Sequence, residues 1–118
     1  WLNFGIGNKM AKGDCYVANG RVVMNMISAP DAKKWKLCHG VGILRTDGKP
    51  FGHAWVEYGN KCIDKSNGKS IELPKKLYYE IGNIPVKGYK IYKYSPEQTG
   101  LKMVRNKHWG PWDSKPPR

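Results

Sequence analysis

The sequence is poor in acidic residues, and it contains no long apolar run. Only 9 Asp and Glu residues stand against 21 Lys and Arg residues, which leaves a formal net charge of +12 at pH 7. Such an excess attracts phosphates and acidic polymers without selecting among them. No stretch approaches the roughly 20 apolar residues of a membrane-spanning helix, and no signal-peptide pattern opens the chain. We therefore expect a soluble protein without a membrane span, made in a cytoplasm or delivered into one. Because the chain begins at Trp1 without a Met, secretion stays open as an alternative.

Cysteine is also scarce, and this excludes a disulfide framework. The three cysteines are Cys15, Cys38 and Cys62. Their odd number leaves one thiol over, and none belongs to a C-x-x-C pair. With His39, His53 and His108 as further ligands, their spacing still matches no common zinc site. We expect no metal and no cofactor, a reducing compartment or one special thiol, and Cys38 and Cys62 packed in the core.

Repeats, low-complexity tracts and linkers are absent as well, which excludes a modular protein. The chain has 118 residues, of which 40% are hydrophobic and 12% aromatic, enough for one core but not two. We predict a single domain over residues 1–118, with an irregular lead-in at 1–12 and a loose tail at 114–118.

Hydrophobic periodicity predicts an α+β fold in which one N-terminal helix packs on a small antiparallel sheet of about four strands. Asp14 is expected to cap the helix, which spans 15–27 and places Cys15 in its first turn. Turn residues at 46–50 and at 59–60 then separate three strands. The predicted elements after the first helix are strands at 37–44, 51–58 and 61–64, a helix at 73–81, a strand at 89–94 and a helix at 96–106.

A cysteine at a helix start, a histidine in a strand and an aspartate in the next strand could form a thiol triad of Cys15, His53 and Asp64. With a two-residue turn at Gly59-Asn60, Trp55 faces Asp64 across the hairpin. His53 and Asp64 are then diagonal neighbours on one face of the sheet. A three-residue turn would place Asp64 on the opposite face.

Each member of such a triad supplies a separate chemical step. The thiolate attacks a carbonyl carbon, the imidazole moves the proton, and the carboxylate fixes the tautomer of the ring. A helix N-terminus would favour the thiolate. The expected oxyanion donors are the backbone N–H of Cys15 and the side chain of Asn8, while Trp55 is a candidate wall of the substrate cleft.

The string Gly52-His53-Ala54-Trp55-Val56-Glu57, followed by Cys62-Ile63-Asp64, resembles the His and Asp strands of papain-like cysteine hydrolases, nearest to their transglutaminase-like branch. NlpC-type cell-wall peptidases share this order of elements. The wider pattern, from G-D-C-Y to the closing H-W-G-P-W-D, looks like small proteins of phage and bacterial genomes. The resemblance implies a papain-like fold with Cys15 as nucleophile, His53 as base and Asp64 as orienting residue. It also implies a peptidase, amidase, deamidase or transglutaminase acting on an amide of a protein, a peptide or peptidoglycan.

Two alternatives from other classes stay open. Taken singly, each triad residue has a plainer explanation, namely a buried thiol, a hydrogen-bonded imidazole and a turn carboxylate, so an inactive relative that grips a partner protein is one alternative. The other is a nucleic-acid-binding module, because cations interleave with aromatics at 33–36, 75–79 and 89–94. An acidic partner or inhibitor protein would suit the same charge. His108 is expected to pack or cap the C-terminal segment, with contact to substrate as its alternative role.

Overall fold

The computed structural model describes the backbone of residues 8–116 and the side chains of residues 14–116. Over these residues the fold is α+β, with an N-terminal helix on a five-stranded antiparallel sheet of order β4-β3-β2-β1-β5. The elements are α1 (Asn8–Met24), β1 (Trp35–Ile43), β2 (Pro50–Tyr58), β3 (Lys61–Asp64), β4 (Ile71–Pro74), α2 (Lys75–Ile81), β5 (Tyr92–Tyr94) and α3 (Pro96–Asn106), with short 3-10 turns η1 (Ala32–Lys34) and η2 (Ser66–Gly68). The predicted fold class is confirmed.

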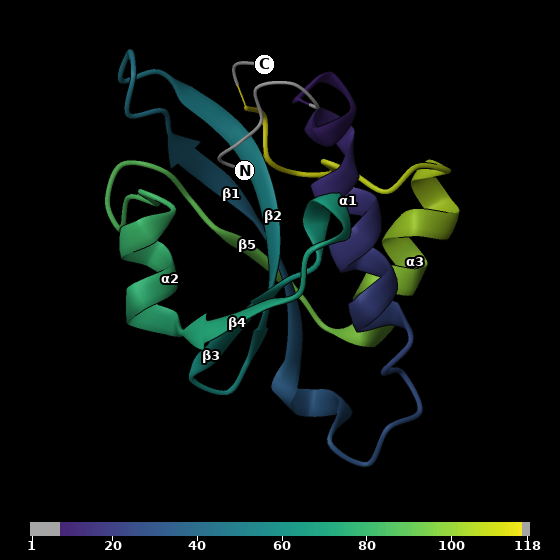
Figure 1. Ribbon diagram of the computed structural model, residues 1–118. Helices are drawn as coiled ribbons and strands as arrows, with labels where there is room; N and C mark the ends of the chain where they lie inside the picture. Colours follow the sequence, from purple (N-terminus) through teal and green to yellow (C-terminus); the bar gives the residue numbers. More distant parts are fainter. Residues whose placement is uncertain (1–7, 117–118) are drawn as a thin grey trace.

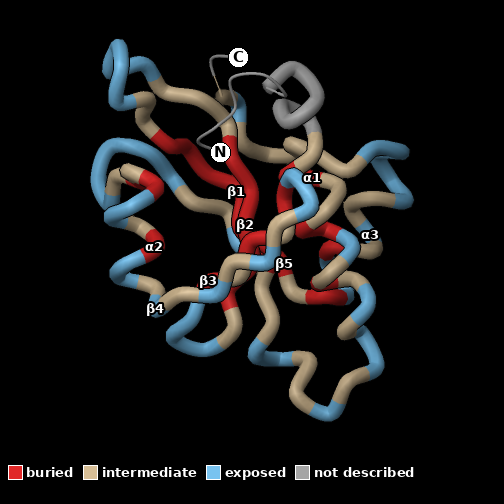
Figure 2. The backbone as a smooth tube through the Cα atoms, viewed as in Figure 1, coloured by how far each residue is buried: buried red, intermediate tan, exposed pale blue. Residues whose placement is uncertain are grey.

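The sheet lies between two helical layers, with α1 and α3 beside one face and α2 beside the other (Figure 1). Alternation along the strands supplies a core to each face. Leu37 and Val56 pack with Val23 on the α1 side, whereas Cys38 and Trp55 pack with Tyr78 on the α2 side. Buried residues are concentrated along β1, β2 and the inner side of α1 (Figure 2).

The central hairpin has the predicted register. Tyr58 pairs with Lys61 and Val56 with Ile63, so the turn contains the two residues Gly59 and Asn60. Gly59 has a φ of 60°, which a glycine adopts without steric cost and which suits such a turn. The parity on which the predicted neighbourhood of His53 and Asp64 depends is therefore confirmed.

The first helix is longer at its start than the sequence predicted. It begins at Asn8 and ends at Met24, so part of the expected irregular lead-in is helical and Asp14 is not its cap. The added stretch contains Lys9, Met10, Ala11 and Lys12, which are all good helix formers. The carboxylate of Asp14 instead accepts a hydrogen bond from the backbone N–H of Asn67 in η2.

Two strands also differ from prediction. The edge strand β4 was not predicted, because its four residues end in a proline and merge with the apolar pattern of α2. The last strand begins at Tyr92 rather than at residue 89, since only three of its residues pair with β1. The bounds predicted for β3 and α3 are confirmed, and Ser95 caps α3 in a capping box with Gln98.

The C-terminal segment packs against the sheet as far as the structure describes it. A Cβ built on Gly52 would lie 2.8 Å from Cγ of Pro116, so the segment predicted as a loose tail approaches β2 at that residue. None of the helices in the described part of the chain combines the length and apolar character that crossing a bilayer requires.

Candidate active site

Cys15, His53 and Asp64 meet at one place, although they belong to three different elements. The Cys15 thiol hydrogen bonds to the His53 imidazole, and Nε2 of His53 lies 3.6 Å from Oδ2 of Asp64. All three side chains are nearly enclosed, with exposed fractions of 6%, 4% and 0% in that order. The structure thus brings together the three residues that the sequence singled out.

The end of β3 explains why a helical thiol can reach an imidazole on the sheet. Pairing between β2 and β3 covers only Val56 to Tyr58, so the part of β2 around His53 continues beyond its neighbour strand. There Nδ2 of Asn19, on α1, donates to the carbonyl oxygen of Ala54 at 3.1 Å. Since Asn19 lies four residues after Cys15 on the same face of α1, this bond holds the thiol over the open edge.

Asp64 is held by a full set of hydrogen bonds. Its Oδ1 accepts from Nδ2 of Asn19 at 3.1 Å and from the backbone N–H and hydroxyl of Ser66 at 3.0 and 2.7 Å. Burial alone would raise the pKa of this carboxyl, but the nearby His53 imidazole and the hydrogen bonds from Ser66 hold the pKa of Asp64 well below its ordinary value. Asp64 is therefore an ionised acceptor that cannot rotate freely.

Tyr78, from α2, stands between the imidazole and the carboxylate. Its hydroxyl lies 2.9 Å from Nε2 of His53 and 2.7 Å from Oδ2 of Asp64. An ionised carboxylate only accepts hydrogen bonds, so the single O–H of Tyr78 donates to Asp64 and its oxygen accepts from His53. Nε2 of His53 consequently carries a proton, which leaves Nδ1 as the nitrogen that can take the proton of the thiol.

The charged form of His53 is favoured despite its burial. Desolvation lowers the pKa of this imidazole, but its interactions with the nearby Asp64 carboxylate and with Cys15 outweigh that cost and raise the pKa of His53 to about 9. An imidazole in this environment accepts the proton of a neighbouring thiol more readily than a free histidine does. The arrangement suits a thiolate and imidazolium pair.

Cys15 does not lie at the start of a helix, so two predictions that depended on that position are wrong, namely stabilisation of the thiolate by the helix N-terminus and an oxyanion bond from the backbone N–H of Cys15. It is the eighth residue of α1, in the third turn. Only the first four N–H groups of a helix lack an intrahelical acceptor, so neither the helix terminus nor the backbone N–H of Cys15 is available to stabilise negative charge. The side chain of Asn8, the other expected oxyanion donor, lies outside the described residues.

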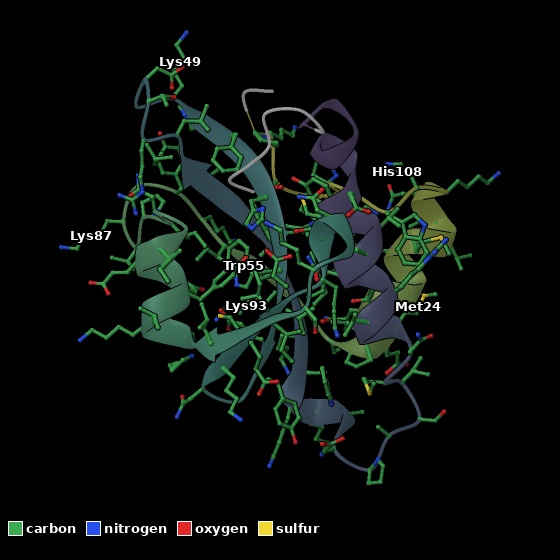
Figure 3. All side chains as sticks on the ribbon, in the orientation of Figure 1. Met24, Lys49, Trp55, Lys87, Lys93 and His108 are labelled. Atoms are coloured by element: carbon green, nitrogen blue, oxygen red, sulfur yellow. The ribbon has the colours of Figure 1, made fainter. Side chains whose placement is uncertain are left out.

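Trp55 does not wall an open cleft, because its exposed fraction is 0%. Its ring stacks behind that of His53, with centroids 5.6 Å apart at 24°. It therefore packs beside the imidazole along the same face of β2 and points toward α2 (Figure 3). In this structure Trp55 therefore has no exposed surface with which to contact a substrate.

The remaining candidates from the sequence have structural roles. Cys38 and Cys62 are fully buried free thiols, as predicted. His108 is exposed and organises the C-terminal turn, where its Nδ1 accepts from the backbone N–H of Gly110 and its carbonyl accepts from the Trp112 indole. Across the residues that the structure describes, no group of three or more His, Cys, Asp or Glu side chains is arranged to hold a metal ion.

Sequence reasoning missed Asn19 and Tyr78. Asn19 could have been found as a polar residue four positions after Cys15 on the inner face of α1, where burial demands a partner. Tyr78 gave no such signal, because only the packing of α2 on the sheet brings its hydroxyl to His53. Comparisons with protein-family models, with curated proteins and with solved structures found no match to this chain.

Proposed function

We propose that this protein is a papain-like cysteine hydrolase or acyltransferase that acts on an amide bond. Cys15 is the nucleophile, His53 the general base and acid, and Asp64 the residue that orients the imidazole. The observation that carries the proposal is the meeting of these three side chains at one enclosed point, with the thiol hydrogen bonded to the imidazole and the carboxylate 3.6 Å from the same ring.

The hydrogen bonds of Tyr78 with His53 and Asp64 determine which nitrogen of His53 takes part in each proton transfer. Nδ1 of His53 takes the proton of Cys15, and the thiolate sulfur attacks the amide carbonyl carbon to form a tetrahedral intermediate. When the C–N bond breaks, the imidazolium returns the proton to the leaving amine or ammonia, and a thioester remains on Cys15. Water or an acceptor amine, deprotonated by His53, then attacks the thioester and restores the thiol. The oxyanion of the tetrahedral intermediate must be stabilised by a hydrogen-bond donor other than the backbone N–H of Cys15.

The second step distinguishes the reactions that this site could catalyse. Attack by water gives a peptidase, an amidase or a deamidase, and attack by an amine gives a transglutaminase. The net charge of +12 favours an acidic protein or peptide, or an anionic polymer such as peptidoglycan, as substrate or partner.

Nucleic-acid binding is less well supported, because the aromatic residues of the basic stretches are used for packing. Tyr78 and Tyr94 have exposed fractions of 0% and 5%, and the Trp35 ring packs against Tyr58 in a tilted arrangement, with centroids 4.6 Å apart. Lys75 and Lys93 are paired with the buried carboxylate of Glu57. Stacking of bases requires exposed rings, and among the aromatics of these stretches only Tyr89 is exposed, at 43%.

The proposal is tested by alkylation of the folded protein with iodoacetamide at pH 6, with mass spectrometry to locate the label. An ordinary thiol, with a pKa of about 8.5, is less than about 1% ionised at pH 6. We expect Cys15 to react at least about tenfold faster than a thiol of the urea-unfolded chain. Release of amine or ammonia from a panel of peptide amides should follow the same thiol and be lost in Cys15→Ser.

Selective labelling of Cys15 is not sufficient, since the other two thiols are fully buried. The decisive control is His53→Gln, which keeps a polar side chain of similar size but removes the base. If His53→Gln folds and reacts as fast as the wild type at pH 6, Cys15 is only the most accessible thiol and the enzymatic proposal is wrong.

A further inference from the structure

We propose that Tyr78 is a positioning residue that couples Asp64 to His53 and holds the ring with Nδ1 toward Cys15. The inference rests on the proposed function, and it assigns a fourth side chain to the same site. It stands on the geometry of three oxygen and nitrogen atoms that are nearly or fully shielded from solvent.

The direct path between the carboxylate and the ring is too long for a good hydrogen bond. Nε2 of His53 and Oδ2 of Asp64 are 3.6 Å apart, beyond the usual range of about 2.7 to 3.2 Å. The two contacts through the Tyr78 hydroxyl measure 2.9 and 2.7 Å. The carboxylate therefore acts on the imidazole mainly through the phenol.

The phenol is also fixed in place. Tyr78 has no exposed surface and belongs to the core on the α2 side of the sheet. Its ring lies nearly parallel to that of His53, with centroids 6.4 Å apart at 17°, and Trp55 stacks beside the same imidazole. Rotation of the His53 ring would break the bond to Tyr78 and disturb both contacts, so the ring is held in one orientation.

The groups that face the His53 ring come from three elements. They are the thiol of Cys15 on α1, the carboxylate of Asp64 at the end of β3 and the hydroxyl of Tyr78 on α2. Glu57, further along the same face of β2, is bonded to Lys75 and Lys93. Loss of the Tyr78 hydroxyl therefore removes an acceptor from the imidazolium while the other charged groups stay.

The neighbouring tyrosine provides a matched control. The Tyr79 hydroxyl, also on α2, donates to Oε2 of the buried Glu57 carboxylate at 2.6 Å. Tyr78→Phe and Tyr79→Phe each delete one tyrosine–carboxylate bond from the same helix, but only the first deletion touches the candidate site. Comparison of the two variants separates an effect on the site from a loss of stability.

The experiment compares iodoacetate with iodoacetamide on Cys15 across pH 5 to 10. The imidazolium attracts the anionic reagent, so in the wild type the ratio of the two rates falls as pH rises through about 9, where His53 loses its charge. In Tyr78→Phe we expect this midpoint to fall by about one pH unit or more, because a charge-assisted hydrogen bond is lost. Tyr79→Phe should keep the wild-type midpoint.

A wild-type midpoint in Tyr78→Phe, or an equal shift in both variants, would overturn the role of Tyr78. A wild type in which Cys15 shows no enhanced reactivity would instead overturn the proposed function. If Tyr78→Phe does not fold, ¹⁵N NMR of the wild type above pH 9 decides the matter, with His39 and His108 assigned by substitution. A proton on Nε2 of His53 supports the relay, and a proton on Nδ1 contradicts it.

Discussion

Asn19 shows how much one buried side chain can organise. Its amide donates to the Ala54 carbonyl and to Asp64, and its Oδ1 accepts from the backbone N–H of Lys65 at 2.8 Å. One residue thus joins α1, β2 and the segment after β3 at the point where the triad residues meet. Its exposed fraction is 0%, so water cannot replace these bonds.

Asn19→Ala is expected to lower the free energy of unfolding by about 1–3 kcal/mol, because it leaves buried polar partners unsatisfied. Urea denaturation monitored by circular dichroism measures this change. Asn25→Ala, at an exposed asparagine just beyond α1, is the control and should stay within about 0.5 kcal/mol of the wild type. Equal stabilities of the two variants would show that the Asn19 bonds contribute nothing net.

At the scale of elements, the C-terminal segment closes the helical layer over α1. A Cβ on Gly20 would lie 2.8 Å from the Trp109 ring, and a Cβ on Gly110 would lie 2.6 Å from Cε1 of His39. Both glycines are needed for close approach, and Gly110 also has a φ of 124°, which other residues rarely adopt. The aromatic segment therefore belongs to the fold rather than to a loose end.

Two glycine substitutions inside helices should have opposite effects. Gly100→Ala on α3 meets only ordinary contacts with Met24 at 3.9 Å and should stabilise the protein by about 0.4–1 kcal/mol, since alanine favours the helix. Gly20→Ala gains the same propensity but displaces Trp109, and we expect a net loss of about 1–2 kcal/mol. Thermal unfolding of both variants is the measurement, and stabilisation by Gly20→Ala would show that Trp109 moves aside without cost.

At the scale of the whole molecule, the pKa values of two buried histidines are shifted in opposite directions. His39 is enclosed by Tyr16, Tyr94 and Trp112, and neither of its ring nitrogens has a hydrogen-bond partner. Burial therefore lowers the pKa of His39 to about 4, whereas the hydrogen bonds of His53 raise the pKa of that residue to about 9. The folded state prefers one imidazole neutral and the other charged.

Stability should therefore be highest near pH 6.5, the ordinary pKa of histidine. Below pH 6.5 His39 is protonated in the unfolded chain, but in the folded state it stays neutral down to about pH 4. Protonation therefore favours the unfolded state, and stability falls as pH falls. Above pH 6.5 the folded state alone keeps the proton of His53 up to about pH 9, so stability falls as pH rises. Each shift contributes up to about 3 kcal/mol.

Urea denaturation at intervals from pH 4 to 10 measures this profile. His39→Leu should flatten the acidic side without affecting the alkaline side, and His53→Gln should do the reverse. An unchanged acidic side in His39→Leu would assign that side to carboxyl groups instead.

Local signals in the sequence predicted those features that depend on near neighbours. The turn at Gly59-Asn60 set the register of β2 and β3, and Ser95 marked the start of α3. Cys15, His53 and Asp64 could be singled out because their order along the chain and the parity of one hairpin sufficed to relate them. Their catalytic roles stay predictions.

How these residues meet depends on contacts between segments that lie far apart in the chain. Whether Asp14 caps a helix or binds the turn at Asn67 depends on a contact between segments 53 positions apart, and Trp55 turned inward because α2 covers its face of the sheet. The hydroxyl of Tyr78 reaches His53 and Asp64 through the packing of that same helix. Because periodicity and turn chemistry are local, the candidate residues and most of the elements could be predicted from the sequence, but not β4 or the start of α1. The position of Cys15 in the third turn of α1 and the Tyr78 bridge between imidazole and carboxylate depend on packing between distant segments, which no local pattern encodes.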